Sequence, residues 1–195
     1  MTQLILIRHG ETDWNVEGRW QGQADVPLNE NGLKQAEQIA QLLSNRKIQA
    51  IYTSDSTRTR RTAEVLGRVI GLRVYIDIRL REIHQGEWQG LLITEIKERY
   101  SEEFRSRRAN PLTIAPPGGE TTKQVQERAL SFIKDISDHY PNEAVAIVSH
   151  GFTIAVIVAH LKRIPFEKVW NLVPKNGDLI ELDIGKSSAA QITIL

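Results

Sequence analysis

The 195-residue chain contains no cysteine. This absence excludes disulfides, thiolate nucleophiles and zinc sites built from cysteine, and it fits a reducing compartment. A dominant charge is missing too, because 25 Lys and Arg stand against 24 Asp and Glu, for a formal net charge of +1. Bulk electrostatics therefore predicts neither a nucleic-acid partner nor an acidic membrane surface as partner.

Targeting segments and long apolar runs are also absent. The N-terminus has no basic segment followed by an apolar core and a small-residue cleavage site, so no secretory signal is expected. No apolar run is long enough to cross a bilayer. Hydrophobic residues make up 41% of the chain and charged residues 25%, as in ordinary globular proteins. These features predict a cytoplasmic protein with a single domain over residues 1–195.

What the chain does have is an alternation of short apolar runs and amphipathic segments. Continuous apolar runs are typical of strands in a parallel sheet covered on both faces. Strands are expected at residues 4–7, 50–53, 73–76, 144–148, 178–184 and 191–195. Helices are expected at 28–45, 57–70, 121–140 and 153–161, with one or two short charged helices at 93–108. The pattern predicts an α/β fold with a mainly parallel sheet. The charged region from about 87 to 119 is either a cap inserted between the third and fourth strands or a solvated surface excursion.

Two of the expected strands end in similar residues. The first runs into Arg8, His9 and Gly10, and the fourth runs into Ser149-His150-Gly151. Ligands of an open parallel sheet bind at the carboxyl ends of its strands, so both imidazoles meet in one pocket if these strands are neighbours. A single histidine in such a place is more commonly a satisfied structural residue, but two at matching ends favour a shared site. Guanidinium and imidazole together suit phosphate, and a neutral imidazole can attack phosphorus.

Two further charged residues stand at favourable positions. Arg58 lies at the expected start of the helix at 57–70, where a helix N-terminus and an arginine together attract an anion. The alternative is a surface arginine like its neighbours Arg60 and Arg61. Glu82 follows the third strand, and a carboxylic acid there can protonate a leaving oxygen. Its alternative is a surface ion pair.

Six stretches occur in a recognisable order along most of the chain. They are Arg8-His9-Gly10-Glu11-Thr12 with Trp14-Asn15, Gln21-Gly22 with Asp25, Leu28, Gly32 and Gln35-Ala36, Thr53-Ser54-Asp55 to Arg58 with Thr62-Ala63, Glu82 to Gly90, Pro117 to Thr121, and Ser149-His150-Gly151. Together they resemble the motifs of the histidine phosphatase superfamily, also called the phosphoglycerate-mutase-like superfamily. One such tripeptide would be weak support, whereas six in order are specific.

The resemblance implies a three-layer α/β/α sandwich with a mainly parallel sheet and a small helical cap. It implies a covalent phosphohistidine on His9, a phosphate pocket completed by Arg8, Arg58 and a protonated His150, and Glu82 as proton donor. Such a group of cations stands where other enzymes use magnesium, so neither a metal nor a cofactor is predicted. The residues expected to contact phosphoryl oxygens or to order the surrounding loop are Asn15, Gln21, Gly22 and Gly151.

Within this superfamily the chain resembles the phosphatases more than the mutases, because it lacks the longer insertions of the mutases. The predicted activity is a metal-independent phosphomonoesterase for a small metabolite, with phosphoserine as a leading substrate. The alternatives are a cofactor-dependent phosphoglycerate mutase and an α-ribazole or broad-specificity phosphatase. One departure concerns specificity, because the phosphoserine type has a histidine directly before the glycine equivalent to Gly86. Here that place is Gln85 and the histidine is His84; either can bind a substrate carboxylate, and a surface role is the alternative for His84.

Several other residues are expected to have structural roles. Arg105, Arg107 and Arg108 are read as a solvated helix face, with attraction of anions over the pocket as the alternative. Trp14 and Trp20 are the tryptophans favoured to line the site. The C-terminal strands offer an edge at which two copies can pair, so a homodimer stays open beside a monomer.

Overall fold

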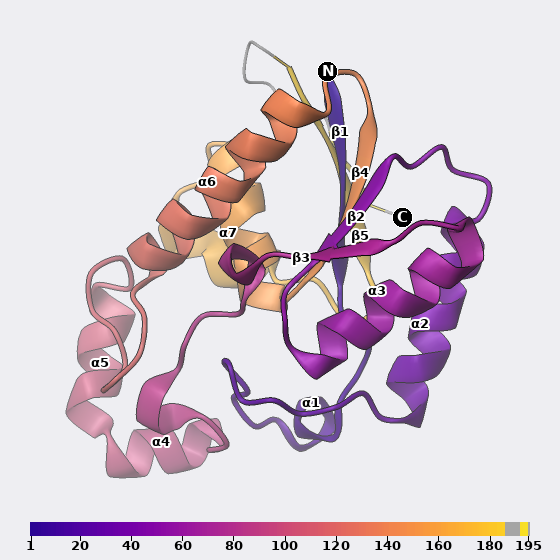
Figure 1. The fold of residues 1–195 in the computed structure, drawn as a ribbon. Coiled ribbons are helices and arrows are strands. Elements are labelled where there is room, and N and C mark those ends of the chain that lie inside the picture. Colours follow the sequence, from indigo (N-terminus) through magenta and orange to yellow (C-terminus); the bar gives the residue numbers. More distant parts are fainter. Residues whose placement is uncertain (186–191, 195) are drawn as a thin grey trace.

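The computed structural model describes residues 1–185 and 192–194. A six-stranded sheet runs through this part of the chain (Figure 1) in the order β3-β2-β4-β1-β5-β6. The strands are β1 (Thr2–Arg8), β2 (Ala50–Thr53), β3 (Val74–Ile76), β4 (Ala144–Ser149), β5 (Leu179–Ile184) and β6 (Ile192–Ile194). The first four are parallel to one another, whereas β5 pairs antiparallel with β1 and β6 pairs antiparallel with β5. The predicted mainly parallel α/β sheet is confirmed; residues 191 and 195 of the last expected strand lie outside the described residues.

Pairing between β1 and β4 decides where the site lies. The two strands are parallel neighbours, and Arg8 pairs with Ser149 at their carboxyl ends. His9 and His150 therefore leave adjacent strands at the same level. The sequence predicts a shared pocket only if these two strands are neighbours, and the pairing of β1 with β4 confirms that they are.

Helices cover both faces of the sheet, because alternate residues of a strand point to opposite sides. Ile5 and Ile7 of β1 pack with α2 (Glu30–Leu43) and α3 (Thr57–Ile70) on one face. Leu4 and Leu6 pack with α6 (Thr122–His139) and α7 (Gly151–Leu161) on the other. Figure 1 shows these two pairs of helices on opposite sides of the strands, which confirms the three-layer sandwich.

Helix α7 is apolar around its whole circumference, and its central residues are buried. One side packs on the sheet and α6, and another packs against Val169 and Val173, within and just after a 3₁₀ helix at Phe166–Leu172. The helix is thus enclosed by protein, and its N-terminus is held rigidly at the end of β4. No helix in the described ranges is long and apolar enough to cross a membrane.

The region between β3 and β4 contains two short helices away from the sheet, α4 (Ile93–Arg99) and α5 (Ser101–Ala109) (Figure 1). We call this pair the cap. It confirms the helical cap insertion, and of the one or two short helices expected at 93–108 the structure has two, which meet at Tyr100. The short helix α1 (Asp13–Glu17) was not predicted, although Thr12 and Asn15 form a capping box that starts it.

Candidate active site

The carboxyl ends of β1 and β4 bring two histidines together. The ring centroids of His9 and His150 lie 5.3 Å apart with an interplanar angle of 67°. Both side chains are buried, at 3% and 1% exposure. The predicted convergence of the two imidazoles is therefore present in the structure.

Hydrogen bonding defines which nitrogen of His9 is available. Its Nδ1 lies 2.7 Å from the carbonyl oxygen of Gly10. Since a carbonyl only accepts, Nδ1 carries the proton and Nε2 keeps a lone pair in the neutral ring. Burial, followed by the charges of Arg58 and Arg8, holds the pKa of His9 well below 6.5. The ring is neutral at physiological pH, with Nε2 able to act as a nucleophile.

A close crossing of backbone positions the segment after His9. A Cβ on Gly10 would lie 2.2 Å from the carbonyl oxygen of Gly32, and a Cβ on Gly32 would lie 2.1 Å from that of Glu11. Neither approach is compatible with a side chain. The two glycines therefore let the chain turn away from His9 against the start of α2.

His150 is neutral in this site without a bound anion, whereas the expected protonated form belongs to the state with phosphate bound. Its Nδ1 lies 3.3 Å from a terminal nitrogen of Arg58, and its Nε2 lies 2.8 Å from Oγ of Ser54. A guanidinium only donates, so Nδ1 accepts and the Nε2 proton is donated to Ser54. Burial, followed by the charge of Arg58, lowers the pKa of His150 well below 6.5. The role of Ser54 was missed, although it directly follows β2.

Two guanidiniums stand beside the histidines, that of Arg58 buried and that of Arg8 half-buried. Arg58, in the first turn of α3, donates to the carbonyls of Gly22 and Ala24 at 2.7 Å each, and burial lowers its pKa to about 10. Arg8 donates to the carbonyl of Pro174 at 2.6 Å, and burial lowers its pKa. The Nε group of each arginine has no hydrogen-bond partner among the described residues. Buried donors without an acceptor indicate a place for an anion.

The carboxylate of Glu82 is held at the N-terminus of α7. Its Oε1 accepts from the amide of Ile83 at 2.9 Å and from the amide and hydroxyl of Thr153, both at 3.1 Å. Its Oε2 accepts one hydrogen bond, from the amide of Phe152 at 3.0 Å. Oε2 is therefore the oxygen with room for a proton.

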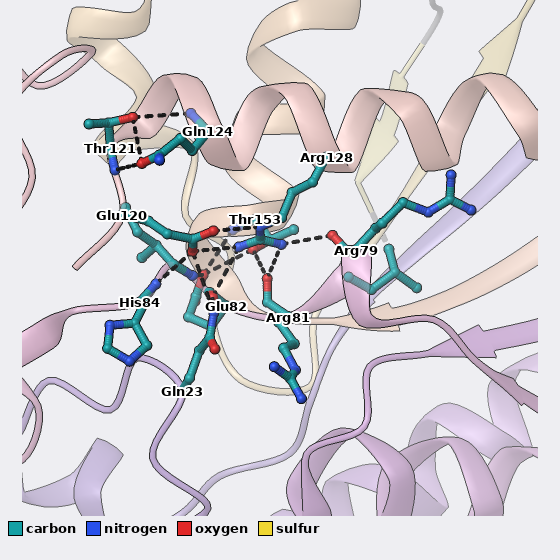
Figure 2. Close-up of polar contacts among 12 residues, drawn as sticks. Gln23, Arg79, Arg81, Glu82, His84, Glu120, Thr121, Gln124, Arg128 and Thr153 are labelled. Atoms are coloured by element: carbon teal, nitrogen blue, oxygen red, sulfur yellow. Dashed lines mark hydrogen bonds and ion pairs between the residues drawn. The ribbon is translucent and has the colours of Figure 1, made fainter. Parts of the chain in front are cut away.

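An arginine missed by the sequence analysis fixes the backbone of this segment. Figure 2 shows Arg128 reaching from α6 toward Glu82 and Glu120. It donates to the carbonyls of Arg79, Arg81 and Glu82 at 2.7, 2.6 and 3.0 Å, and it pairs with Glu120 at 3.0 Å. No local signal marks its role at Glu82, because the three carbonyls that it binds lie 46 to 49 positions earlier in the chain.

Side-chain amides add further donors. The Oδ1 of Asn15 accepts from the amide and hydroxyl of Thr12 and from Nδ2 of Asn176, which leaves Nδ2 of Asn15 for a ligand. The Oε1 of Gln85 accepts from Arg107 at 2.7 Å, which leaves its Nε2. The cavity therefore offers donors, and donors recognise an anion.

A cavity of about 160 Å³ connects these groups, and we call it the strand-end cavity. The predicted site residues that line it are Arg8, His9, Asn15, Gln21, Gly22, Arg58, Glu82, Gln85 and Gly151. A neighbouring hollow of about 260 Å³ shares Arg58 and Glu82 with it and also reaches His150. The structure thus brings the predicted residues together, with one exception.

The exception is His84, which lines neither hollow. Its Nδ1 accepts a hydrogen bond from the amide of Gly86 at 3.1 Å. Of the two favoured tryptophans, Trp20 lines the strand-end cavity and Trp14 does not.

The expected solvated face of 105–108 is wrong for Arg107. Only 5% of Arg107 is exposed, whereas Arg105 and Arg108 are exposed. Its guanidinium lies over the rings of Trp20 and Trp88, at 5.8 and 5.4 Å. Within residues 1–185 and 192–194, no group of three or more His, Cys, Asp and Glu side chains is arranged to hold a metal ion.

Comparison with known proteins places this arrangement in a family. The profile of the histidine phosphatase superfamily (branch 1) matches residues 4–193. Phosphoserine phosphatase 1 of Hydrogenobacter thermophilus is 36% identical over 171 residues, covering 88% of this chain and 81% of the relative. The "Probable phosphoglycerate mutase GpmB" of Cronobacter sakazakii is 36% identical over 191 residues, covering 96% and 87%.

The solved structures agree. The crystal structure of the α-ribazole phosphatase from Shigella flexneri superposes with a TM-score of 0.89 at 27% identity, covering 99% of this chain and 95% of that one. The motifs, the fold and the two histidines at the strand ends thus all indicate the same family. The chain belongs to branch 1 of the histidine phosphatase superfamily and is a phosphoric monoester hydrolase.

Proposed function

We propose that this enzyme hydrolyses a small phosphomonoester without a metal, through a phosphohistidine on His9. The observation that carries the proposal is the hydrogen bond from Nδ1 of His9 to the carbonyl of Gly10. It directs the lone pair of Nε2 away from the backbone, and it stabilises the positive ring that forms when Nε2 bonds to phosphorus.

In the first step Nε2 of His9 forms a bond to phosphorus while the bond from phosphorus to the leaving oxygen breaks. Glu82 enters protonated on Oε2 and gives that proton to the leaving oxygen, which departs as an alcohol. Arg8 and Arg58 meet the charge on the phosphoryl oxygens. The unpartnered Nε groups of both arginines support this role.

In the second step Glu82, now a carboxylate, takes a proton from water. The water oxygen bonds to phosphorus, the bond to Nε2 breaks, and its electron pair returns to the ring of His9. Inorganic phosphate leaves, and the proton stays on Glu82 for the next cycle. The hollow shared by Arg58, Glu82 and His150 is the route that we assign to this water.

His150 takes part through its environment. It is neutral before substrate binds because burial, followed by the charge of Arg58, lowers its pKa well below 6.5. A bound phosphate dianion raises the pKa of a neighbouring imidazole. We therefore expect His150 to take up a proton only when the anion is present, releasing Arg58 to turn fully toward the phosphate.

For the substrate, phosphoserine is a leading candidate. A relative named phosphoserine phosphatase supports it, and the Nε2 of Gln85 is a donor that suits a carboxylate. Because Gln85 stands where the phosphoserine type has a histidine, and His84 lies outside the cavity, a substrate carboxylate would be bound here by a different side chain. The alternatives are phosphoglycerate mutase activity, supported by the name of another relative, and α-ribazole or broad-specificity phosphatase activity, supported by a structural neighbour.

The test is phosphate release in excess EDTA from phosphoserine, 3-phosphoglycerate, α-ribazole phosphate, fructose 2,6-bisphosphate and 4-nitrophenyl phosphate. Conversion of 3-phosphoglycerate to 2-phosphoglycerate, with the bisphosphate supplied, runs in parallel. We expect release that EDTA does not change, and a radioactive phosphoryl group on the protein after rapid quenching. His9→Ala should lose both turnover and label. Turnover that survives this substitution, or efficient isomerisation without phosphate release, would overturn the proposal.

The wider expectations belong to the same proposal. We propose a single domain over residues 1–195, a cytoplasmic location and a small-molecule phosphomonoester as the partner, without nucleic acid or membrane. A homodimer stays open beside a monomer.

A further inference from the structure

A second cavity of about 440 Å³ lies between the cap and the residues that carry the strand-end cavity. We call it the cap cavity. Its walls include Trp20, Trp88, Phe104 and Trp170. It is larger than the strand-end cavity, which measures about 160 Å³.

The walls of the cap cavity are built from aromatic rings in contact with one another. The ring centroid of Trp20 lies 5.8 Å from that of Trp88 and 5.7 Å from that of Trp170. Phe104 of α5 lies 5.9 Å from Trp88. Such rings offer flat apolar surface, which favours another ring over a small polar group.

The charges on the cap cavity select against a cation. Lys97, Arg107 and Arg108 line it, against one acid, Glu167. No carboxylate of the described residues is within hydrogen-bonding distance of Arg107, and one of its terminal nitrogens is buried without a partner. An occupant that is neutral or negative therefore fits, whereas a free ammonium group does not.

The two cavities adjoin each other. Trp20 and Trp170 line both, so a molecule whose phosphate reaches His9 extends past these two rings into the cap cavity. With the phosphate at His9, the rings of Trp20 and Trp170 border space that is open to the leaving alcohol.

We propose that the cap cavity is the binding site for the alcohol part of the substrate. The alcohol is apolar, contains a ring and is neutral or negatively charged. This inference rests on the proposed function and narrows its substrate class. Phosphoserine remains the candidate that the name of a relative supports, but the cap cavity favours a larger ring-bearing ester, because phosphoserine brings an ammonium group toward Lys97, Arg107 and Arg108.

The test compares pairs of alkyl phosphates whose alcohols have nearly the same acidity. The unmodified enzyme is assayed with propyl phosphate, 3-phenylpropyl phosphate and an analogue of the latter with an aminomethyl group on the ring. We expect kcat/KM for the phenyl compound to exceed that for propyl phosphate by at least about tenfold, since even one methylene in an apolar pocket gives about that discrimination. The cationic analogue should lose most of the advantage.

Substitutions in the wall locate the effect. Trp170→Ala and Phe104→Ala should each lower the ratio of the two kcat/KM values by about threefold or more. Trp170 is 45% exposed, so its removal does not threaten folding. Tyr75→Ala is the matched control, because Tyr75 is an exposed ring on β3 and lines neither cavity; its ratio should stay unchanged.

The outcomes separate this inference from the proposed function. Hydrolysis of propyl phosphate without any advantage for the phenyl compound would overturn the cap cavity as a binding site and leave the phosphatase proposal intact. An advantage that Trp170→Ala and Phe104→Ala both leave unchanged would also overturn it. If the unmodified enzyme hydrolysed none of these phosphates and carried no phosphoryl label on His9, the proposed function itself would be overturned.

Discussion

Arg58 and Arg107 are both buried guanidiniums, and burial lowers the pKa of each to about 10, yet their surroundings differ. Arg58 in the strand-end cavity is held by two backbone carbonyls, from Gly22 and Ala24. Arg107 in the cap is held by one side chain, Gln85, and by two tryptophan rings.

This difference in hydrogen-bond partners suggests separate roles for the strand-end cavity and the cap. The carbonyls of Gly22 and Ala24 belong to the backbone of the loop between α1 and α2, so they cannot turn independently of that loop. The strand-end cavity is therefore suited to chemistry that needs fixed positions. Side-chain partners in the cap can repack, so the cap is suited to selecting the alcohol. Predictions that affect one region and not the other test this division.

The largest effect is expected from Glu82→Gln, which removes the proton donor and keeps the side-chain shape. General acid catalysis contributes about 10²- to 10⁴-fold, so hydrolysis of alkyl phosphates should slow by that order. With 4-nitrophenyl phosphate, whose leaving group needs no proton, the loss should be small. The ratio between phenylpropyl and propyl phosphates should not change, because the cap is intact.

Glu87→Gln is the control for that substitution, since Glu87 is exposed and lines neither cavity. Its rates should match those of the unmodified enzyme. Equal losses on alkyl and nitrophenyl esters in Glu82→Gln would contradict the assignment of the acid.

A smaller effect concerns pH and the two buried histidines. Their pKa values lie well below 6.5 in the folded protein and near 6.5 when unfolded, so unfolding takes up protons below pH 6.5. Their stabilisation is therefore complete above pH 6.5 and is lost as pH falls below it. The expected slope is about 1.4 kcal/mol per pH unit for each histidine, measured by urea unfolding between pH 5 and 7.5.

His9→Asn removes one of the two groups that take up a proton on unfolding, so the slope should fall by about 1.4 kcal/mol per pH unit. His139→Asn and His160→Asn should leave it unchanged, because both side chains are exposed. If the slope of His9→Asn equalled that of the unmodified protein, the neutral ring in the strand-end cavity would be wrong. Saturating phosphate should flatten the slope in the unmodified protein, since the anion raises both pKa values.

The smallest effect is expected where the two regions meet. Arg107→Leu removes the hydrogen bond that orients Gln85, and one such bond is worth about 3- to 10-fold in binding. The inhibition constant of inorganic phosphate should rise by that factor with no change in kcat. Arg105→Leu is the control, because Arg105 lies on the same helix, is exposed and lines neither cavity.

An unchanged inhibition constant for phosphate in Arg107→Leu would contradict the predicted effect of Gln85 on phosphate binding. It would show that the cap and the strand-end cavity act independently. A fall in kcat would contradict the division of roles between the two regions, since the cap would then contribute to the chemistry.

Much of the site could be predicted from sequence because its parts are local. The apolar run of β1 stops at Arg8, so the sequence alone shows that His9 and Gly10 lie at the end of the strand. Arg58 is likewise found in the first turn of α3. Glu82 was found by its position after a strand, but its attachment to the amides of α7 was not, because those amides lie 70 positions away. Arg128 was missed for the same reason.

The sequence by itself determined the alternation of strands and helices, the residues at the strand ends and the chemistry that those residue types allow. Only the tertiary structure decided that β1 and β4 are neighbours and that His150 is neutral. It also decided that Arg107 is buried against two tryptophan rings while Arg105 and Arg108 are exposed. The physical reason is that backbone pattern depends on neighbouring residues, whereas burial, hydrogen-bond partners and pKa depend on what distant segments bring to the same place.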